Sequence, residues 1–288
     1  MKVLTTIQQV RDFVQAARAR QLSVGLVPTM GNLHEGHYSL IRAAAKECGC
    51  VVVSVFVNPT QFGPNEDYAT YPRTPEQDLA GCQAGGAAAV FMPSVEEMYP
   101  RGQTLATVSI ASLGDNLCGA SRSGHFTGVC TVVSKLFNIV RCDKAFFGMK
   151  DFQQLTIIRR MVDDLNFPIE IVPCPTVREP DGLAMSSRNS KLSKEDRAQA
   201  PALHASLELA REMILEGVRD SRAIIEAIAA KIAAQAPGGA IDYVKVVHPD
   251  TLKDVQVPDG PVLVALAVRF QGARLIDNIL VDAAAKAS

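Results

Sequence analysis

An alternation of short apolar runs with helical patterns constrains the fold of this chain more than any other feature. The runs lie at residues 24–28, 51–57, 87–92 and 169–173. In the helical segments, apolar residues recur every three or four positions, which is the spacing of one buried helix face. Strands that alternate with helices form βαβ units, so we predict the α/β class with a Rossmann-like, doubly wound parallel sheet.

The composition of the chain changes near residue 178. The segment VREPDGLAMSSRNSKLS combines turn formers with charges, and an alanine-rich helical region follows at 195–235. After PGG at 237–239, the runs IDYVKVV, PVLVALAVRF and RLIDNILV are separated by turns and are typical of strands. We therefore predict two domains, residues 1–177 and a smaller α+β domain at residues 178–288.

Composition also excludes several classes of function. The 288 residues include 29 basic and 30 acidic side chains, and this balance gives no basic surface for nucleic acid. The sequence has neither a bilayer-spanning apolar run nor a signal peptide, so we expect a cytoplasmic protein with small-molecule partners and no membrane contact. The seven cysteines are scattered through apolar segments, which favours core positions over a zinc cluster.

A glycine-bearing turn within VPTMGNLHEGHYSLIRAA, residues 27–44, joins the first of these strands to a helix. Free N–H groups at the start of a helix and the helix dipole favour an anion such as phosphate there. Gly31 and Gly36 permit close approach of the backbone, and His34 and His37 are spaced so that both rings could reach one ligand. The alternative is a pair of turn histidines satisfied by backbone groups, whereas HEGH lacks the spacing of a metalloprotease motif.

Two amides follow the second strand, in the segment FVNPTQF at residues 56–62. Asn58 and Gln61 should lie at the carboxyl edge of the sheet, where open α/β sheets bind ligands, although a solvent-facing loop amide is the alternative for Gln61. The loop continues to residue 73, and a loop of this length typically covers a site or moves. For the next helix, Thr74 and Gln77 predict a capping box.

Two further segments offer groups that bind phosphate. Lys150 and Asp151 adjoin Gly148 at another strand-to-helix junction, which suits a cation for phosphate and an acceptor for ribose or metal. Ser186, Ser187 and Arg188 provide hydroxyl and guanidinium donors in AMSSRN. The alternatives are a surface ion pair for the first segment and a solvated linker for the second.

The histidine turn resembles a known family signature. The order of strand, Met30-Gly31 and HxGH is similar to the HIGH signature of class I nucleotidyl transferases, which transfer AMP from ATP. More narrowly, PTMGNLHEGH resembles the pantothenate synthetase family, whose members join pantoate to β-alanine. Four further stretches follow in the family's order, namely FVNPTQF, YPRTPEQD, FFGMKDFQQL and AMSSRN. Two positions depart from its pattern, Met149 where an acidic or polar residue is usual and Ser123 where proline is usual.

The resemblance implies a set of site residues. Those implied for ATP are Met30, Gly31, Asn32, Leu33, His34, Glu35, Gly36, His37, Gly148, Met149, Lys150, Asp151, Val177, Met185, Ser186, Ser187 and Arg188. Those expected to bind the other substrates are Gln61, Gln154 and Asn58. The catalytic candidates share the charge that builds on the phosphates, and they are His37, His34, Lys150 and Arg188. Arg122 and His125 are expected near the site or packed beneath it.

The reaction implied by the resemblance runs through a pantoyl adenylate. The carboxylate of pantoate attacks the α-phosphorus of Mg·ATP and releases pyrophosphate, and the amine of β-alanine then displaces AMP. Mg²⁺ is expected with ATP. The sequence does not identify its protein ligands, and Asp78 is the one candidate contact. The residue 178–288 domain is expected to act as a lid that shields the adenylate from water. The family also implies a homodimer.

Two other functions stay open at this point. One is another HIGH-type adenylyl or cytidylyl transferase that acts on a phosphorylated small molecule. The other is a nucleotide-binding regulator without catalysis, which the intact His34, His37, Lys150 and Arg188 argue against.

Overall fold

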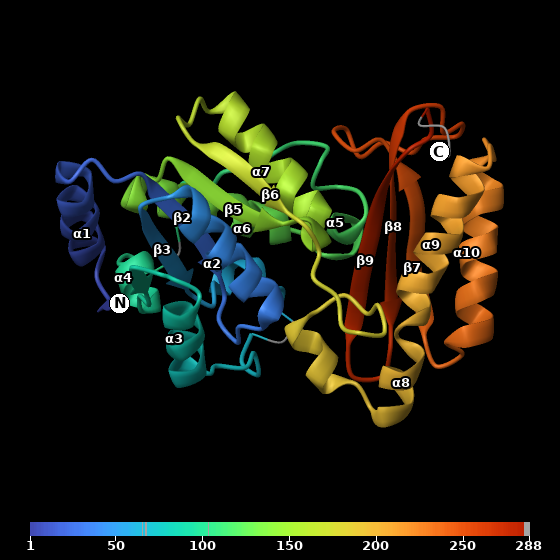
Figure 1. The fold of residues 1–288 in the computed structure, drawn as a ribbon, viewed down its shortest axis with the longest axis horizontal. Helices are drawn as coiled ribbons and strands as arrows, with labels where there is room; N and C mark the ends of the chain where they lie inside the picture. Colours follow the sequence, from blue (N-terminus) through green and yellow to red (C-terminus); the bar gives the residue numbers. More distant parts are fainter. Residues whose placement is uncertain (65, 67, 103, 285–288) are drawn as a thin grey trace. The chain divides into compact units, whose positions relative to one another are not determined.

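The computed structural model describes residues 1–64, 66, 68–102 and 104–284, which form two compact units (Figure 1). Unit 1 consists of Met1–Gly114, Gly119–Met149 and Ile157–Pro175. Unit 2 consists of Asp115–Cys118, Lys150–Thr156 and Thr176–Ser288. Two short segments from the middle of the sequence therefore group with the C-terminal part of the chain.

Unit 1 contains a parallel sheet of six strands, which confirms the predicted architecture. The strands are β1 (Lys2–Leu4), β2 (Val24–Thr29), β3 (Cys50–Val55), β4 (Ala89–Phe91), β5 (Lys144–Gly148) and β6 (Glu170–Cys174). They lie in the order β1-β4-β3-β2-β5-β6, so the direction of winding reverses between β2 and β5. Doubly wound sheets bind ligands outside the carboxyl ends of the strands at this switch point, where Thr29 and Gly148 lie.

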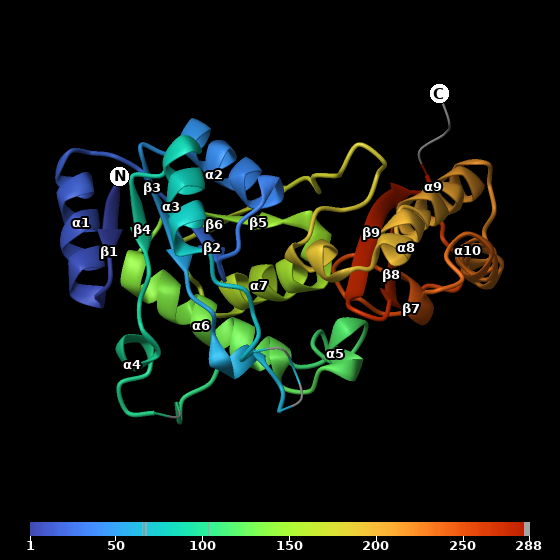
Figure 2. The ribbon, with the colours of Figure 1, turned by 90° about the horizontal axis from the view of Figure 1, so that it is seen from below.

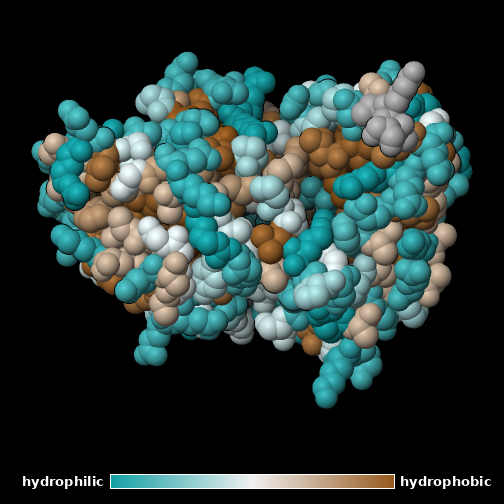
Figure 3. All heavy atoms as spheres, viewed as in Figure 1, coloured by the Kyte–Doolittle hydropathy of each residue, from teal (hydrophilic) through white to brown (hydrophobic). Residues whose placement is uncertain are grey.

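Helices cover both faces of the sheet of unit 1. They are α1 (Ile7–Ala19), α2 (Glu35–Glu47), α3 (Pro75–Ala84), α4 (Val95–Met98) and α6 (His125–Val140), with the short 3-10 helix η1 (Pro59–Gln61). Figure 2 shows α2 and α3 on one side of the sheet and α6 on the other. The apolar face of α2 packs into one core cluster with Val27 and Val53, and hydrophilic residues lie over its outer side in Figure 3. This burial orients α2 with its N-terminus at the end of β2.

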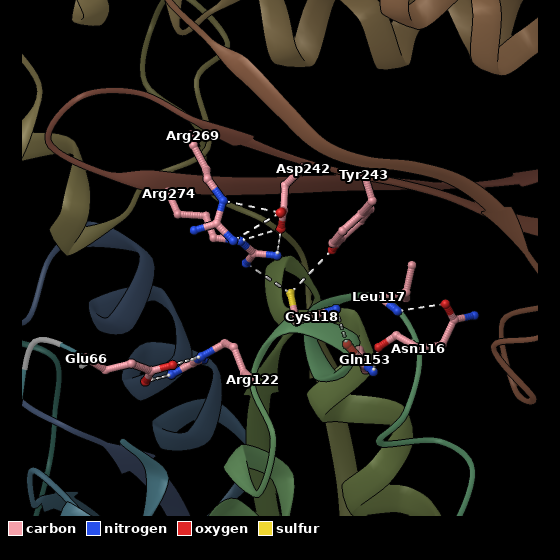
Figure 4. A network of polar contacts seen from close by, with 10 residues as sticks. All are labelled: Glu66, Asn116, Leu117, Cys118, Arg122, Gln153, Asp242, Tyr243, Arg269 and Arg274. Atoms are coloured by element: carbon pink, nitrogen blue, oxygen red, sulfur yellow. Dashed lines mark hydrogen bonds and ion pairs between the residues drawn. The ribbon is translucent and has the colours of Figure 1, made fainter. Parts of the chain in front are cut away.

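Three elements lie where the chain changes unit, namely α5 (Cys118–Ser121), η2 (Met149–Asp151) and α7 (Phe152–Asp164). Within unit 2, Cys118 ties its segment to the sheet, as Figure 4 shows. Its sulfur lies 3.3 Å from Oη of Tyr243 and 3.4 Å from Nη1 of Arg274. Arg274 in turn donates to Asp242 from Nε and Nη2 at 2.9 and 2.7 Å.

Unit 2 pairs helices with an antiparallel sheet, which confirms the predicted α+β character of this part of the chain. The elements are η3 (Ser187–Lys191), α8 (Lys194–Gln199), α9 (Ala202–Leu215), α10 (Ser221–Gln235), β7 (Ala240–Val247), β8 (Pro261–Arg269) and β9 (Arg274–Asp282), with strand order β7-β8-β9. Leu207 of α9 and Ile228 of α10 pack with Val264 and Leu266 of β8 in one apolar core.

The structure tests three smaller predictions. All seven cysteines are buried and free, which confirms their assignment to the core. The capping box at the start of α3 is wrong, because Thr74 makes no side-chain cap bond and instead donates its hydroxyl to Oδ1 of Asp78 at 3.1 Å. None of the helices in the described ranges combines the length and apolar character needed to cross a membrane.

Candidate active site

The turn between β2 and α2 is fixed by its own backbone and by one buried carboxylate. Gly31 and Asn32 have φ angles of +84° and +50°, in the left-handed region that glycine enters without steric cost. Asp78 of α3 is only 1% exposed, and its oxygens accept hydrogen bonds from the N–H groups of Asn32 and Leu33 at 3.0 and 2.8 Å. A Cβ at Gly31 would lie 3.0 Å from Oδ2 of this carboxylate. The turn is therefore a tightly held corner at the switch point of the sheet.

The two histidines of this corner cap α2. His34 is the N-cap residue, and its Nδ1 accepts from the N–H of Gly36 at 3.1 Å, while Nδ1 of His37 accepts from the N–H of His34 at 3.3 Å. The two ring centroids lie 4.2 Å apart. A nitrogen that accepts is unprotonated, so each neutral ring carries its proton on Nε2. Because the backbone role uses Nδ1, it is compatible with donation from Nε2 to an anion.

Asp78 does not fit the magnesium contact suggested by the sequence. Both of its oxygens accept from backbone N–H groups, and Oδ1 also accepts from the hydroxyl of Thr74. Among the described residues, no group of three or more His, Cys, Asp or Glu side chains is placed to hold a metal ion.

Asn58 holds Gln61 in a fixed orientation at the end of η1. Asn58 is 1% exposed, and its Nδ2 donates to Oε1 of Gln61 at 3.0 Å and to the carbonyl of Gly128 at 3.3 Å. Its Oδ1 accepts from the hydroxyls of Tyr99 at 2.7 Å and Thr60 at 3.0 Å. Since Oε1 of Gln61 accepts, Nε2 is the end of this amide that can donate, which is the polarity a carboxylate ligand requires.

A second set of contacts holds the same loop through its backbone. Nδ1 of His125 lies 2.8 Å from the carbonyl oxygen of Gln61, and Nε2 of His125 lies 2.8 Å from Nη1 of Arg122. Arg122 also pairs with both carboxylate oxygens of Glu66, at 2.8 and 2.6 Å (Figure 4). These hydrogen bonds from Arg122 hold the pKa of Glu66 below its usual value. His125 and Arg122 thus support the position of Gln61.

Residues 150–154 of unit 2 include the side-chain cation of Lys150 and the side-chain amide of Gln154. Nζ of Lys150 lies 3.5 Å from Oδ2 of Asp151, and the lysine side chain is 20% exposed. Gln154 is half-buried in the first turn of α7. Its neighbour Gln153 has a structural task, because its side chain accepts from the N–H of Cys118 at 3.0 Å and donates to the carbonyl of residue 116 at 2.7 Å.

A short hairpin brings Val177 and Met185 together in unit 2. The N–H of Met185 donates to the carbonyl of Val177 at 3.0 Å, and a single antiparallel bridge joins residues 178 and 184. The chain leaves the hairpin into η3, where Oγ of Ser186 accepts from the N–H of Arg188 at 3.2 Å. Hydroxyl and guanidinium groups therefore follow the hairpin directly.

The predicted site residues divide between the two units. Unit 1 contains Met30–His37, Asn58, Gln61, Gly148 and Met149, and unit 2 contains Lys150, Asp151, Gln154, Val177 and Met185–Arg188. Sequence reasoning missed the residues that hold these groups in place, above all Asp78 as the anchor of the corner and Asn278, which donates to the carbonyl of Lys150 at 2.8 Å. The YPRTPEQD stretch was the one signal for Asp78, and no sequence pattern pointed to Asn278.

Comparison with known proteins identifies the family. A family model described as pantoate-beta-alanine ligase matches residues 2–280. The pantothenate synthetase of Moorella thermoacetica is 54% identical over 98% of this chain and 99% of its own length. That of Alcanivorax borkumensis is 50% identical over 97% of both chains.

Solved structures agree with the sequence matches. The crystal structure of pantothenate synthetase from Thermus thermophilus is 45% identical and superposes with a TM-score of 0.91 over 97% of this chain and 99% of its own. A structure of pantoate-beta-alanine ligase from Francisella tularensis, complexed with beta-gamma ATP and beta-alanine, is 34% identical with a TM-score of 0.78 over 97% of each chain. On both grounds, the chain belongs to the pantoate–β-alanine ligase family.

Proposed function

We propose that this chain joins pantoate to β-alanine in an ATP-dependent reaction that releases AMP and pyrophosphate. The observation that carries the proposal is the corner at the switch point, where two imidazoles cap α2 at a site suited to phosphate. Family membership selects this reaction among those that a HIGH-type corner can serve. The bound ligands of the Francisella tularensis relative support the choice of nucleotide and amine.

The ATP-binding residues of this proposal are Met30–His37, Gly148–Asp151, Val177 and Met185–Arg188. Nε2–H of His34 and His37 donates to phosphate oxygens, and Lys150 and Arg188 supply positive charge. A Cβ at Gly148 would meet no protein atom within 4 Å, so the space beside this glycine can be taken by a ligand. The neutral tautomer of the histidine cap favours hydrogen-bond donation by His37 over a permanent positive charge.

Pantoate is bound by Gln61 and Gln154, and Asn58 acts on it through Gln61. The support for this division is that Asn58 is buried and uses its amide on Gln61, Gly128 and Tyr99, whereas the donor end of Gln61 is oriented by those contacts. Gln61 also contacts β-alanine in the proposal. Neutral amides orient the carboxylate of pantoate without stabilising it as strongly as an arginine would.

The chemistry proceeds by two displacements. A carboxylate oxygen of pantoate attacks the α-phosphorus of ATP, the bond to the bridging oxygen breaks, and pyrophosphate leaves. The neutral amine of β-alanine then attacks the carbonyl carbon of the pantoyl adenylate, AMP leaves with the electrons of the C–O bond, and the amine loses a proton to solvent. A Mg²⁺ ion bound with ATP would reduce the charge on its phosphates. No protein side chain is acylated, so positioning and charge stabilisation supply the acceleration.

Three further parts of the proposal concern the whole protein. Residues 178–288 form a lid domain that shields the adenylate from water, residues 1–177 form the domain that binds ATP and pantoate, and the enzyme is a cytoplasmic homodimer. Leu105, which is 99% exposed, is a candidate contact between the two copies. Sedimentation of the purified protein tests this point, and Leu105→Asp should weaken self-association.

The decisive experiment is incubation with ATP, Mg²⁺, pantoate and β-alanine. We expect AMP and pantothenate in equal amounts, and exchange of labelled pyrophosphate into ATP that requires pantoate. Exchange that requires a phosphate ester instead would assign the chain to another HIGH-type nucleotidyl transferase reaction. Binding of ATP without any turnover would indicate a regulator.

A further inference from the structure

Two adjacent residues of β9, Asp277 and Asn278, contact two different segments of unit 2. Successive residues of a strand point to opposite faces of the sheet, so the two side chains diverge. Both are largely buried, at 3% and 9% exposure. A buried aspartate is unexpected at this position, because Leu275 and Ile279 on the same face of β9 belong to the apolar core.

Asp277 binds Arg178 through a two-bonded fork. Nη1 and Nη2 of Arg178 donate to Oδ2 and Oδ1 of Asp277 at 2.6 and 3.1 Å. The arginine side chain is 20% exposed and that of the aspartate 3%. A planar guanidinium paired in this way fixes orientation as well as distance.

Arg178 also holds the hairpin that leads into the AMSSRN segment. Its Nη1 donates to the carbonyl oxygen of Gly182 at 3.1 Å, across the tip of the hairpin. Gly182 has a φ of +91°, and a Cβ there would lie 2.8 Å from the ring of His204, so the tip of the hairpin requires glycine. Because Met185 is hydrogen-bonded to the other end of this hairpin, the Arg178–Asp277 fork sets where Met185–Arg188 begins.

Asn278 holds the second segment. Its Nδ2 donates to the carbonyl oxygen of Lys150 at 2.8 Å, and its own N–H donates to Oδ1 of Asp277 at 2.8 Å. The carboxylate of Asp277 is therefore shared between Arg178 and the backbone of Asn278. One strand thereby connects the backbone of Lys150 to the base of the 185–188 segment.

We propose that Arg178, Asp277 and Asn278 are positioning residues that hold Lys150 and Arg188 in register for one nucleotide. The inference rests on the proposed function, since it assumes that Lys150 and Arg188 bind ATP phosphates. Stability alone is a weak reason for the arrangement, because a buried ion pair can often be replaced by packed apolar residues without loss of stability. What an apolar replacement would lose is the fixed geometry of two hydrogen-bonded segments.

Three substitutions test the proposal. Asn278→Ala removes one hydrogen bond to the carbonyl of Lys150 and should lower kcat/KM for ATP about 3- to 10-fold. Arg178→Lys keeps the positive charge but loses the two-bonded fork, and we expect it to lower kcat/KM for ATP by a similar factor. Asp277→Asn should cost more, because it leaves the largely buried guanidinium of Arg178 without a carboxylate. KM for β-alanine should stay within about twofold of the wild-type value in all three variants, since none of the substitutions changes a residue proposed to bind β-alanine.

Asp242→Asn is the matched control. In the same sheet, Asp242 accepts from Nε and Nη2 of Arg274 at one oxygen and from Arg269 at the other. The side chains of Asp242 and Arg274 are both 18% exposed. Substitution of Asp242 should lower the midpoint of thermal unfolding but leave kcat/KM for ATP unchanged. If Asp277→Asn does not fold, Asn278→Ala and Arg178→Lys still decide the question.

A double-mutant cycle separates positioning from general support of the fold. If Asn278 acts through Lys150, Asn278→Ala should have no further effect on ATP kinetics in a Lys150→Ala background. Losses that multiply, or variants whose ATP kinetics match those of Asp242→Asn, would overturn the proposal and leave the proposed function intact. A wild-type enzyme without pantoate-dependent pyrophosphate exchange would instead remove the proposed function, and this inference with it.

Discussion

The corner at residues 29–37 and the segment at residues 185–188 are both assigned to phosphate, yet they are held in different ways. The corner follows a buried strand, caps a long helix and is anchored by Asp78 at both oxygens. The second segment has only a short 3-10 helix of its own, capped by Ser186. The hairpin that leads into it is also held by the Arg178–Asp277 fork, between residues 99 positions apart.

This difference separates two designs for a phosphate-binding segment. The corner is held by its own helix cap and by Asp78 within unit 1, so its shape is formed whenever unit 1 is folded. The 185–188 segment takes its position from a remote strand, so its order depends on contacts that can be released without unfolding the sheet. We therefore expect changes at the corner to affect chemistry or the stability of unit 1, and changes at the segment to affect mainly the binding of ATP.

The largest effect is expected for His37→Ala. Loss of one donor to the reacting phosphates should lower kcat about 100- to 1000-fold. The lost cap bond to His34 should cost only about 1 kcal/mol of stability, so the protein should remain folded. Steady-state kinetics and thermal unfolding measured on the same sample check both statements.

His248→Ala is the control for this prediction. Nδ1 of His248 accepts from the N–H of Asp250 at 3.2 Å, which is the same kind of bond at an exposed turn of unit 2. It should cost comparable stability and leave kcat unchanged. A His37→Ala protein that unfolds, or that turns over like the His248→Ala protein, would mean that the histidine is structural.

The next effect is a loss of stability in Asp78→Asn. An amide can accept at only one end, so its NH₂ group would face a backbone N–H of the corner and leave a buried donor without an acceptor. We expect the free energy of unfolding of unit 1 to fall by about 1 to 3 kcal/mol. Urea denaturation of Asp78→Asn and of Ser186→Ala compares the corner with the 185–188 segment. The free energy of unfolding should fall by less than about 1 kcal/mol in Ser186→Ala. Equal losses would contradict the contrast between corner and segment.

Local sequence was sufficient for the fold and for the elements that carry the candidate site residues. The parallel sheet, the turn that joins β2 to α2 and the placement of Gln61 after β3 follow from periodicity and from turn chemistry within a few residues. The anchors were not predictable, because Asp78 reaches back 45 and 46 residues and Asn278 reaches 128 residues. The capping box at Thr74 failed for a local reason, since the hydroxyl of Thr74 donates to the carboxylate of Asp78 four residues later, and that carboxylate also accepts from the corner.

A smaller effect is expected for Gln61→Arg, which tests whether the substrate amide is oriented as tightly as the corner. Arginine cannot accept from Asn58, and its charge would stabilise the carboxylate of pantoate before it attacks. Turnover should therefore fall by about tenfold while pantoate affinity falls less, as measured by steady-state kinetics and by pantoate binding. Gln77→Arg, on an exposed face of α3, is the control and should change neither value. Lost affinity with normal turnover would count against the idea.

The smallest effect is a pH-dependent contribution from Glu66, which supports the Gln61 loop through Arg122. Since the pKa of Glu66 is lowered in the folded protein, its ion pair stabilises the fold above the unfolded-state pKa and is lost as pH falls through the folded-state pKa. Glu66→Gln should cost about 1 kcal/mol at pH 7, and this difference should vanish once the wild-type carboxylate is protonated. Thermal unfolding from pH 7 down into the acid range measures it. Glu226→Gln removes a fully solvated pair with Arg222 and should show no such trend. A Glu66→Gln deficit that persists at low pH would assign the effect to lost packing, and the loop would then be held by His125 without help from this charge.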